Sequence, residues 1–290
     1  MSTISEIMQG WQNILLVPDD AVKQQAESRA AICDTCEFKV PITNPVTQAV
    51  VKAFGAPAYK CSQCQCPIKA KVFSPYTKCP VDKWGQMSFD PETPSTGVPI
   101  TLTENIQQLE SFCSDTECQE IITAAETKIQ LALERGVTGT KPGPPPMNYE
   151  ECKNVPLNVF PLDRKIAALT NTEGNRGSNL YVSKFKVSEE EPERHDYFAP
   201  GDPNYDQIIK GGNIRKTLKI FLNDDYEGGE IYFPSIDLTI QPKKGMVLIF
   251  DNIVNGEFTN NSNYCDLPVT SGEKWIATKW IRDTPAPIVQ

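Results

Sequence analysis

Histidine is almost absent from this sequence: His195 is the single histidine among 290 residues. A metal site that needs two imidazoles from one chain is therefore excluded. The sequence also has no apolar run long enough to span a membrane, and its first residues lack the basic segment and cleavage site of a signal peptide. A glycine-rich phosphate loop and a GxSxG elbow are missing as well. We expect a protein that folds in a reducing cytoplasm and makes no membrane contact.

The composition is that of an ordinary globular protein, with 39% hydrophobic and 22% charged residues. The formal net charge of −9 at pH 7 argues against extended binding to nucleic acid or to anionic membranes. The stretch 60–83 is locally basic, with five lysines against Asp82. It could form a nucleic-acid patch, but a solvated face or a protein contact is the simpler interpretation.

Cysteine is abundant and unevenly placed, because six of the ten cysteines lie between positions 33 and 79. Without a secretory signal, such clustering indicates a metal site rather than a disulfide framework. Two CxxC pairs predict a structural zinc held by four thiolates, although the same ligands also allow an iron–sulfur cluster. The predicted ligands are Cys33, Cys36, Cys61 and Cys64, with Cys66 and Cys79 as possible substitutes.

The chain divides into five predicted segments. Residues 1–30 form a helical arm around Trp11, 31–85 the cysteine-rich zinc module, 86–103 a linker, 104–285 the second domain and 286–290 a tail. The proline-rich stretch 136–148 predicts an exposed loop within the second domain.

Helices precede strands in the second domain. A helix should begin at Ser114 or Asp115 and bury Ile121, Ile122, Ala125 and Ile129, and a short helix should span 162–169. Short apolar runs separated by Gly, Pro, Asn and Asp then predict an antiparallel barrel or jelly roll. The predicted strands are 179–187, 217–222, 230–233, 238–240, 246–250 and 274–281.

Two resemblances add to this pattern. The runs ICDTC and CSQCQCPIKAKVFSPYTKCPVDKW resemble a cysteine-rich module of tailed-bacteriophage proteins. Five segments resemble the prolyl 4-hydroxylase branch of the iron(II)- and 2-oxoglutarate-dependent dioxygenases: SFCSDTECQEII, HDYFAPGD, TLKIFLNDDYEGGEIYFP, IQPKKGMVLIFDN and LPVTSGEKWIATKWIRD. The second resemblance implies an α+β fold: a double-stranded β-helix, or jelly roll, with flanking helices.

The same resemblance implies an iron site made by a His-x-Asp pair and a distal histidine. Its register places Arg194 at the first histidine, Asp196 at the aspartate and Tyr264 at the distal histidine. A guanidinium repels a divalent metal, and a phenol is a poor ligand for ferrous iron at neutral pH. The sequence therefore argues against bound iron and 2-oxoglutarate.

Part of the cosubstrate pocket is kept. The resemblance assigns the distal carboxylate of 2-oxoglutarate to Lys274, while its tyrosine partner is replaced by Phe185. Lys274 could retain a residual anion site, or it could simply pair with an acid inside the barrel.

Three functions remain open. The first is a non-catalytic structural or interaction protein, built on a degenerate dioxygenase fold, that binds other subunits of a bacteriophage virion at the tail or baseplate and is assembled into it in the host cytoplasm. The second is a prolyl or peptidyl hydroxylase with an atypical metal site. The third is a nucleic-acid-binding zinc module with an inert barrel. We expect the first, since the barrel lacks the two histidines.

Overall fold

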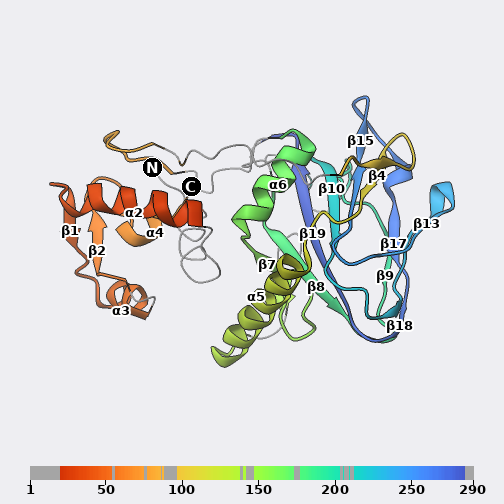
Figure 1. The fold of residues 1–290 in the computed structure, drawn as a ribbon, viewed down its shortest axis with the longest axis horizontal. Coiled ribbons are helices and arrows are strands. Elements are labelled where there is room, and N and C mark those ends of the chain that lie inside the picture. Colours follow the sequence, from red (N-terminus) through yellow and green to blue (C-terminus); the bar gives the residue numbers. More distant parts are fainter. Residues whose placement is uncertain are drawn as a thin grey trace. The chain divides into compact units, whose positions relative to one another are not determined.

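The computed structural model of the chain describes residues 20–53, 56–74, 77–85, 87, 97–137, 140–141, 147–172, 177–202, 205, 209 and 212–284. The chain divides into two compact units (Figure 1). The first comprises Met1–Glu92, Asn158–Asn171 and Pro287–Gln290, and the second comprises Thr93–Leu157 and Thr172–Ala286. The expected arm around Trp11, most of the linker and the tail lie outside the described residues, so the predicted domain boundaries remain predictions.

The first unit contains short helices and a two-stranded antiparallel sheet. Its elements are α2 (Asp20–Asp34), β1 (Lys39–Pro41), α3 (Pro45–Ala53), β2 (Tyr59–Cys61), α4 (Ile68–Val72) and α6 (Phe160–Thr170). Buried Arg29 of α2 donates hydrogen bonds to the carbonyls of Val72, Ser74, Thr77 and Gly85. One buried side chain thus provides hydrogen bonds to four backbone carbonyl groups, as buried polar groups require.

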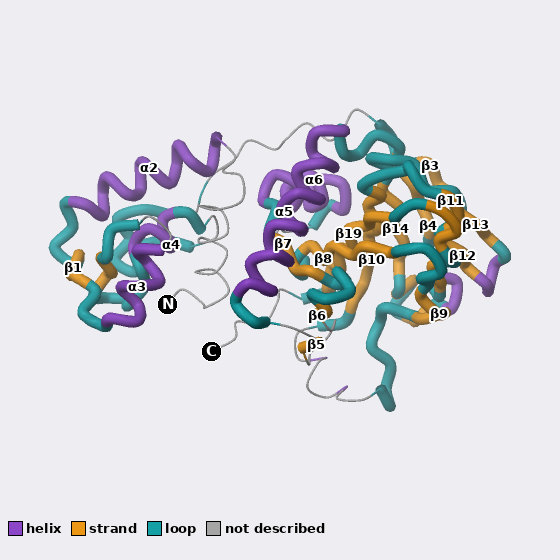
Figure 2. The backbone as a smooth tube through the Cα atoms, turned by 90° about the horizontal axis from the view of Figure 1, so that it is seen from below, coloured by secondary structure: helices purple, strands orange, loops and turns teal. Residues whose placement is uncertain are grey.

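The second unit is built on two antiparallel sheets (Figures 1 and 2). The larger sheet has the order β3 (Ile100–Thr101), β4 (Ile106–Leu109), β14 (Val247–Asp251), β10 (Ile214–Phe221), β19 (Lys274–Arg282), β8 (Leu180–Phe185) and β7 (Val155–Leu157). The smaller one has the order β13 (Leu238–Ile240), β12 (Ile231–Phe233), β17 (Tyr264–Asp266) and β9 (Glu191–Arg194). Three short pairs complete it: β11 (Glu227–Gly228) with β18 (Val269–Ser271), β15 (Ile253–Val254) with β16 (Glu257–Phe258), and β5 (Thr140–Lys141) with β6 (Met147–Asn148).

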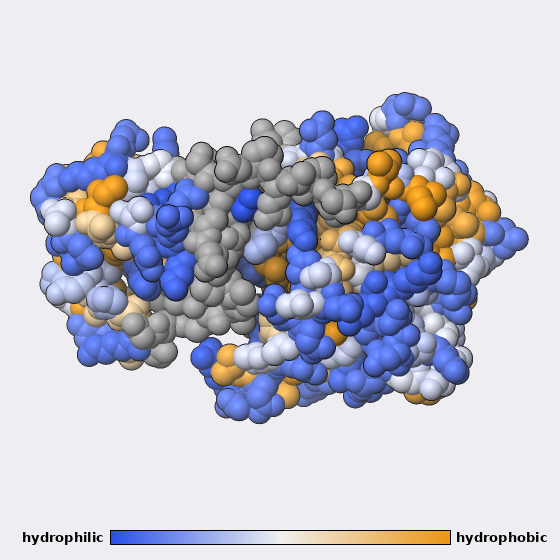
Figure 3. Space-filling model, viewed as in Figure 1, coloured by the Kyte–Doolittle hydropathy of each residue, from blue (hydrophilic) through white to orange (hydrophobic). Residues whose placement is uncertain are grey.

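Helix α5 (Asp115–Glu134) begins where the sequence predicts. The Ser114 hydroxyl accepts a hydrogen bond from the Glu117 amide, and the Glu117 carboxylate accepts one from the Ser114 amide, which forms a capping box. The helix buries one face, as expected: Cys118, Ile121, Ile122, Ala125 and Ile129. None of the described helices is long and apolar enough to cross a membrane. On the face drawn in Figure 3, hydrophilic residues are interspersed with small apolar patches.

The main core lies between the two sheets. Alternate residues of both sheets point into it, as in a jelly roll. Phe233 contacts Phe250 edge to face, and Phe250 contacts Tyr264 in the same way. The cluster comprises Ile106, Phe185, Phe221, Ile231, Phe233, Ile240, Met246, Leu248, Phe250, Tyr264, Val269 and Ile276.

The six predicted strands and the helix at 162–169 are confirmed, with ends that differ by a few residues. The fold is therefore mixed α/β with large antiparallel sheets. Strands β9 and β17 escape prediction because their sequences, EPER and YCD, are polar or short. Both strands carry residues of the candidate site.

Candidate functional site

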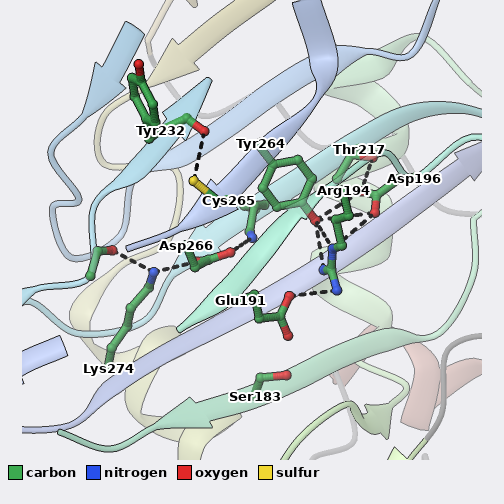
Figure 4. Close-up of polar contacts among 12 residues, drawn as sticks. Ser183, Glu191, Arg194, Asp196, Thr217, Tyr232, Tyr264, Cys265, Asp266 and Lys274 are labelled. Atoms are coloured by element: carbon green, nitrogen blue, oxygen red, sulfur yellow. Dashed lines mark hydrogen bonds and ion pairs between the residues drawn. The ribbon is translucent and has the colours of Figure 1, made fainter. Parts of the chain in front are cut away.

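The cationic side chain of Arg194 lies among oxygen atoms of neighbouring side chains (Figure 4). Arg194 on β9 is paired directly with Tyr264 on β17. Its Nε and Nη2 atoms donate hydrogen bonds to the Tyr264 hydroxyl at 3.0 and 2.8 Å. Its Nη1 lies 2.6 Å from Glu191 Oε2, and its Nε lies 3.7 Å from Asp196 Oδ1. We name these four residues the Arg194 cluster.

Asp196 is held by neutral donors as well. Buried Thr217 of β10 donates its hydroxyl hydrogen to Asp196 Oδ2 at 2.8 Å, and Asn252 Nδ2 donates to Thr217 Oγ1 at 3.0 Å. The Tyr264 hydroxyl lies 3.3 Å from both oxygens of Asp196. Arg194 and Asp196 thus form an ion pair, and the Tyr264 hydroxyl contacts both partners.

Electrostatics fix the charges of this cluster. Burial raises the pKa of Tyr264 well above its ordinary value, and the attraction of Arg194 only partly opposes this, so Tyr264 stays a neutral phenol. Burial by itself would lower the pKa of Arg194, but Tyr264, Asp196 and Glu191 outweigh it and raise that pKa. Arg194 is therefore a permanent cation.

A second charged cluster has the opposite arrangement, with one anion between two cations. Asp266 of β17 accepts hydrogen bonds from Lys219 Nζ at 2.5 Å and from Lys274 Nζ at 2.6 Å, one to each carboxylate oxygen. The three side chains are 1%, 2% and 0% exposed, respectively. Lys274 also donates to the Gly229 carbonyl at 2.7 Å. We name Lys219, Asp266 and Lys274 the Asp266 cluster.

The Asp266 cluster has two cations for one anion. Burial alone would raise the pKa of Asp266, but Lys219 and Lys274 more than offset it and hold that pKa below its ordinary value. Burial lowers the pKa of Lys219, against the attraction of Asp266. Of the two interpretations for Lys274, pairing with an acid is what the structure contains, and that acid is Asp266.

The sequence finds some of these residues and misses others. It identifies Arg194, Asp196, Tyr264 and Lys274, and Phe185 lies opposite Lys274 on β8. His195, by contrast, is turned aside: its Nδ1 lies 2.8 Å from the Tyr197 carbonyl oxygen and its ring stacks on Tyr197. The missed members are Glu191, Lys219 and Asp266. Period-two alternation could have found Asp266, because it shares a strand face with Tyr264.

The four predicted zinc ligands Cys33, Cys36, Cys61 and Cys64 do not all line one pocket in the described part of the chain. Across the described ranges, no group of three or more His, Cys, Asp or Glu side chains is arranged to hold a metal ion. Three of the predicted cysteines line one small apolar pocket together with the proposed substitute Cys79, but Cys64 is not among its lining residues.

The thiols of Cys64 and Cys33 contact other side chains. The Cys64 Sγ accepts a hydrogen bond from Lys71 Nζ at 3.3 Å, and this thiol interacts with buried Cys66. Those contacts, with Cys66 first, lower the pKa of Cys64 to about 5. Trp84 Nε1 donates to Cys33 Sγ at 3.4 Å. The two CxxC pairs predict four thiolates around one metal, whereas Cys64 contacts Lys71 in the structure.

The two antiparallel sheets that face each other place the second unit in the class of jelly-roll proteins. No model of a known protein family matches the chain. A putative prolyl 4-hydroxylase of Acanthamoeba polyphaga mimivirus is 31% identical over 186 residues, which cover 60% of this chain and 73% of that protein. Probable prolyl 4-hydroxylase 9 of Arabidopsis thaliana is 29% identical over 199 residues, covering 60% and 67%. The chain belongs to the prolyl 4-hydroxylase family.

Among solved structures, the chain is similar to the viral collagen prolyl hydroxylase of Paramecium Bursaria Chlorella virus-1 in its 2OG complex. The identity is 23%, the TM-score is 0.46, and the match covers 62% of this chain and 96% of that one. A prolyl-4-hydroxylase of Pseudomonas putida is 14% identical with a TM-score of 0.38, over 64% and 90%.

The family membership corrects two expectations. The relatives are prolyl 4-hydroxylases, which contradicts the prediction of a non-catalytic component of a phage particle. The prediction against iron and 2-oxoglutarate is wrong for the same reason. Arg194 and Tyr264 exclude a two-histidine shell, but a replaced ligand pair does not exclude the family's reaction with other donors.

The residues at the family's iron position do not fit a ferrous ion as they lie. The resemblance calls for two imidazoles and a carboxylate, and of these Asp196 alone is present. The Arg194 guanidinium fills the space between the oxygen atoms of Glu191, Asp196 and Tyr264. A permanent cation there repels a divalent metal.

Proposed function

We propose that this chain hydroxylates prolyl or other peptidyl residues, with a metal site that differs from the family's. The main support is the 31% identity to a putative prolyl 4-hydroxylase over 73% of that protein's length. The relatives at 25% to 29% identity carry the same name, so the similarity is not confined to one protein.

The barrel interior lends further support. Its polar groups are gathered at the two places that the resemblance assigns to the metal and to the cosubstrate, the Arg194 cluster and Lys274. The oxygens around Arg194 come from Glu191, Asp196 and Tyr264. A hydroxylase built on this site would therefore hold its metal differently from the family's two imidazoles and one carboxylate.

The experiment that tests the proposal is a hydroxylation assay with iron(II), 2-oxoglutarate and proline-containing peptides. We expect a peptide to gain one oxygen atom, detected by mass spectrometry, together with formation of succinate. The Asp196→Asn variant is the control, and its fold is checked by circular dichroism. If no peptide gains oxygen while a known prolyl 4-hydroxylase modifies the same peptides in parallel, the proposed function is wrong.

A further inference from the structure

The Asp266 cluster places two ammonium groups on one carboxylate, away from water. Lys219 Nζ lies 2.5 Å from Asp266 Oδ2, and Lys274 Nζ lies 2.6 Å from Asp266 Oδ1. Each carboxylate oxygen thus accepts a charge-assisted hydrogen bond from its own lysine, the kind of bond that also holds a bound carboxylate. Buried charges are normally balanced by partners, so the excess positive charge here marks a site suited to an anion.

Spare hydrogen-bond donors surround the same carboxylate. Each ammonium group has three N–H donors, and Lys274 uses a second one on the Gly229 carbonyl at 2.7 Å. The hydroxyl of Tyr226 is buried and has no hydrogen-bond partner in the part of the chain that the structure describes. Both side chains border Gly229: a Cβ built there would lie 3.0 Å from Lys274 Cδ and 3.3 Å from Tyr226 Cε2.

The backbone fixes Asp266 in place. Strand β17 pairs with β12 through Ile231 and with β9 through Glu191, both opposite Asp266. The Leu267 amide then donates to the Glu230 carbonyl at 2.9 Å. Because the backbone on both sides of Asp266 is held, its carboxylate can leave the two lysines only by rotating its side chain.

We propose that Lys219 and Lys274 form a carboxylate-binding site that Asp266 fills from within, so that Asp266 competes with a small carboxylic acid for it. A carboxylate held by the chain competes at a high effective concentration, so a dissolved ligand binds weakly while Asp266 is present. The site itself rests on the geometry; that its ligand is the carboxylate of a 2-oxo acid rests on the proposed function.

Chemical rescue of Asp266→Ala tests the site. This variant leaves a gap the size of a carboxylate between two buried lysines. Formate should raise its melting temperature, by roughly 5 to 10 °C at about 100 times the dissociation constant, and formamide, the neutral analogue, should not. The wild-type protein should respond to neither compound. If the variant does not fold alone, formate and not formamide should restore soluble protein on refolding.

Titration calorimetry then tests the competition. The Asp266→Ala variant, kept folded, should bind 2-oxoglutarate at least about tenfold more tightly than the wild type, a difference of 1.4 kcal/mol. Adding Lys274→Met should abolish the gain. Equal effects of formate and formamide would overturn the site, and equal affinities of variant and wild type would overturn the competition. Neither measurement depends on turnover, so a failed hydroxylation assay would leave this proposal standing.

Discussion

The two charged clusters of the barrel have opposite charge arrangements. In the Arg194 cluster one cation lies among oxygen atoms, at the position that the resemblance gives to the metal. In the Asp266 cluster one anion lies between two cations, at the position given to the cosubstrate's carboxylate. The side chain of Arg194 is 36% exposed, whereas that of Asp266 is 1% exposed. Each position is thus filled by a charged side chain of the protein itself. Arg194 has the sign of a metal ion and is partly exposed, whereas Asp266 has the sign of the cosubstrate's carboxylate and is fully buried.

How deeply a charged side chain is buried decides how much its ion pair contributes to the stability of the fold. Near the surface, water screens an ion pair and replaces a lost partner, so the pair adds little stability. In the interior, a charge without its partner cannot be solvated, and its removal costs several kcal/mol. We therefore expect the Asp266 cluster to dominate stability.

The largest effect should follow Asp266→Ala. It leaves Lys219 and Lys274 without their common carboxylate at 2% and 0% exposure. We expect a loss of about 3–5 kcal/mol in the free energy of unfolding, measured by urea denaturation. A loss below about 1 kcal/mol would show that the two clusters do not differ as described.

The next largest effect should come from lowering the pH, which should weaken the contribution of the Asp266 cluster to stability. The folded-state pKa of Asp266 is depressed by Lys219 and Lys274, against burial. Its contribution to stability is therefore complete above the unfolded pKa of about 3.9 and is lost as the pH falls through and below that value. Comparing wild type with Asp266→Asn in urea between neutral pH and acid should show this loss in the wild type alone. Parallel pH profiles would contradict it.

A smaller effect should follow Tyr264→Phe. The change removes the hydroxyl that accepts from two nitrogens of Arg194, but Glu191 and Asp196 remain as partners. We expect a loss of about 1–3 kcal/mol, by the same denaturation. Tyr232→Phe is the matched control, because its hydroxyl contacts Asp237 at the surface, and it should leave stability unchanged.

The smallest effect should follow Glu191→Gln. Glu191 lies 2.6 Å from Arg194, but the side chains are 18% and 36% exposed. A partly exposed pair contributes about 0–1 kcal/mol, and added salt should reduce even that. A loss as large as that of Asp266→Ala would contradict the claim that the buried cluster contributes more to stability than the partly exposed one.

Much of this fold could be predicted from the sequence, because short apolar runs and the turn residues between them mark the strands. The register of the resembling segments also located Arg194, Asp196 and Tyr264. Asp266 could not be given its role, since its function depends on Lys219, 47 residues away along the chain. The partner of Cys64 was missed for a similar reason: CxxC spacing says nothing about Lys71, which a helical turn brings to the thiol.

One structure would test the central claim that the chain's own charges fill both positions. Crystals of Asp266→Ala soaked in 2-oxoglutarate should show a ligand carboxylate between the Nζ atoms of Lys219 and Lys274, where the Asp266 oxygens lie now. Lysines turned away toward other groups, with no carboxylate between them, would contradict the account.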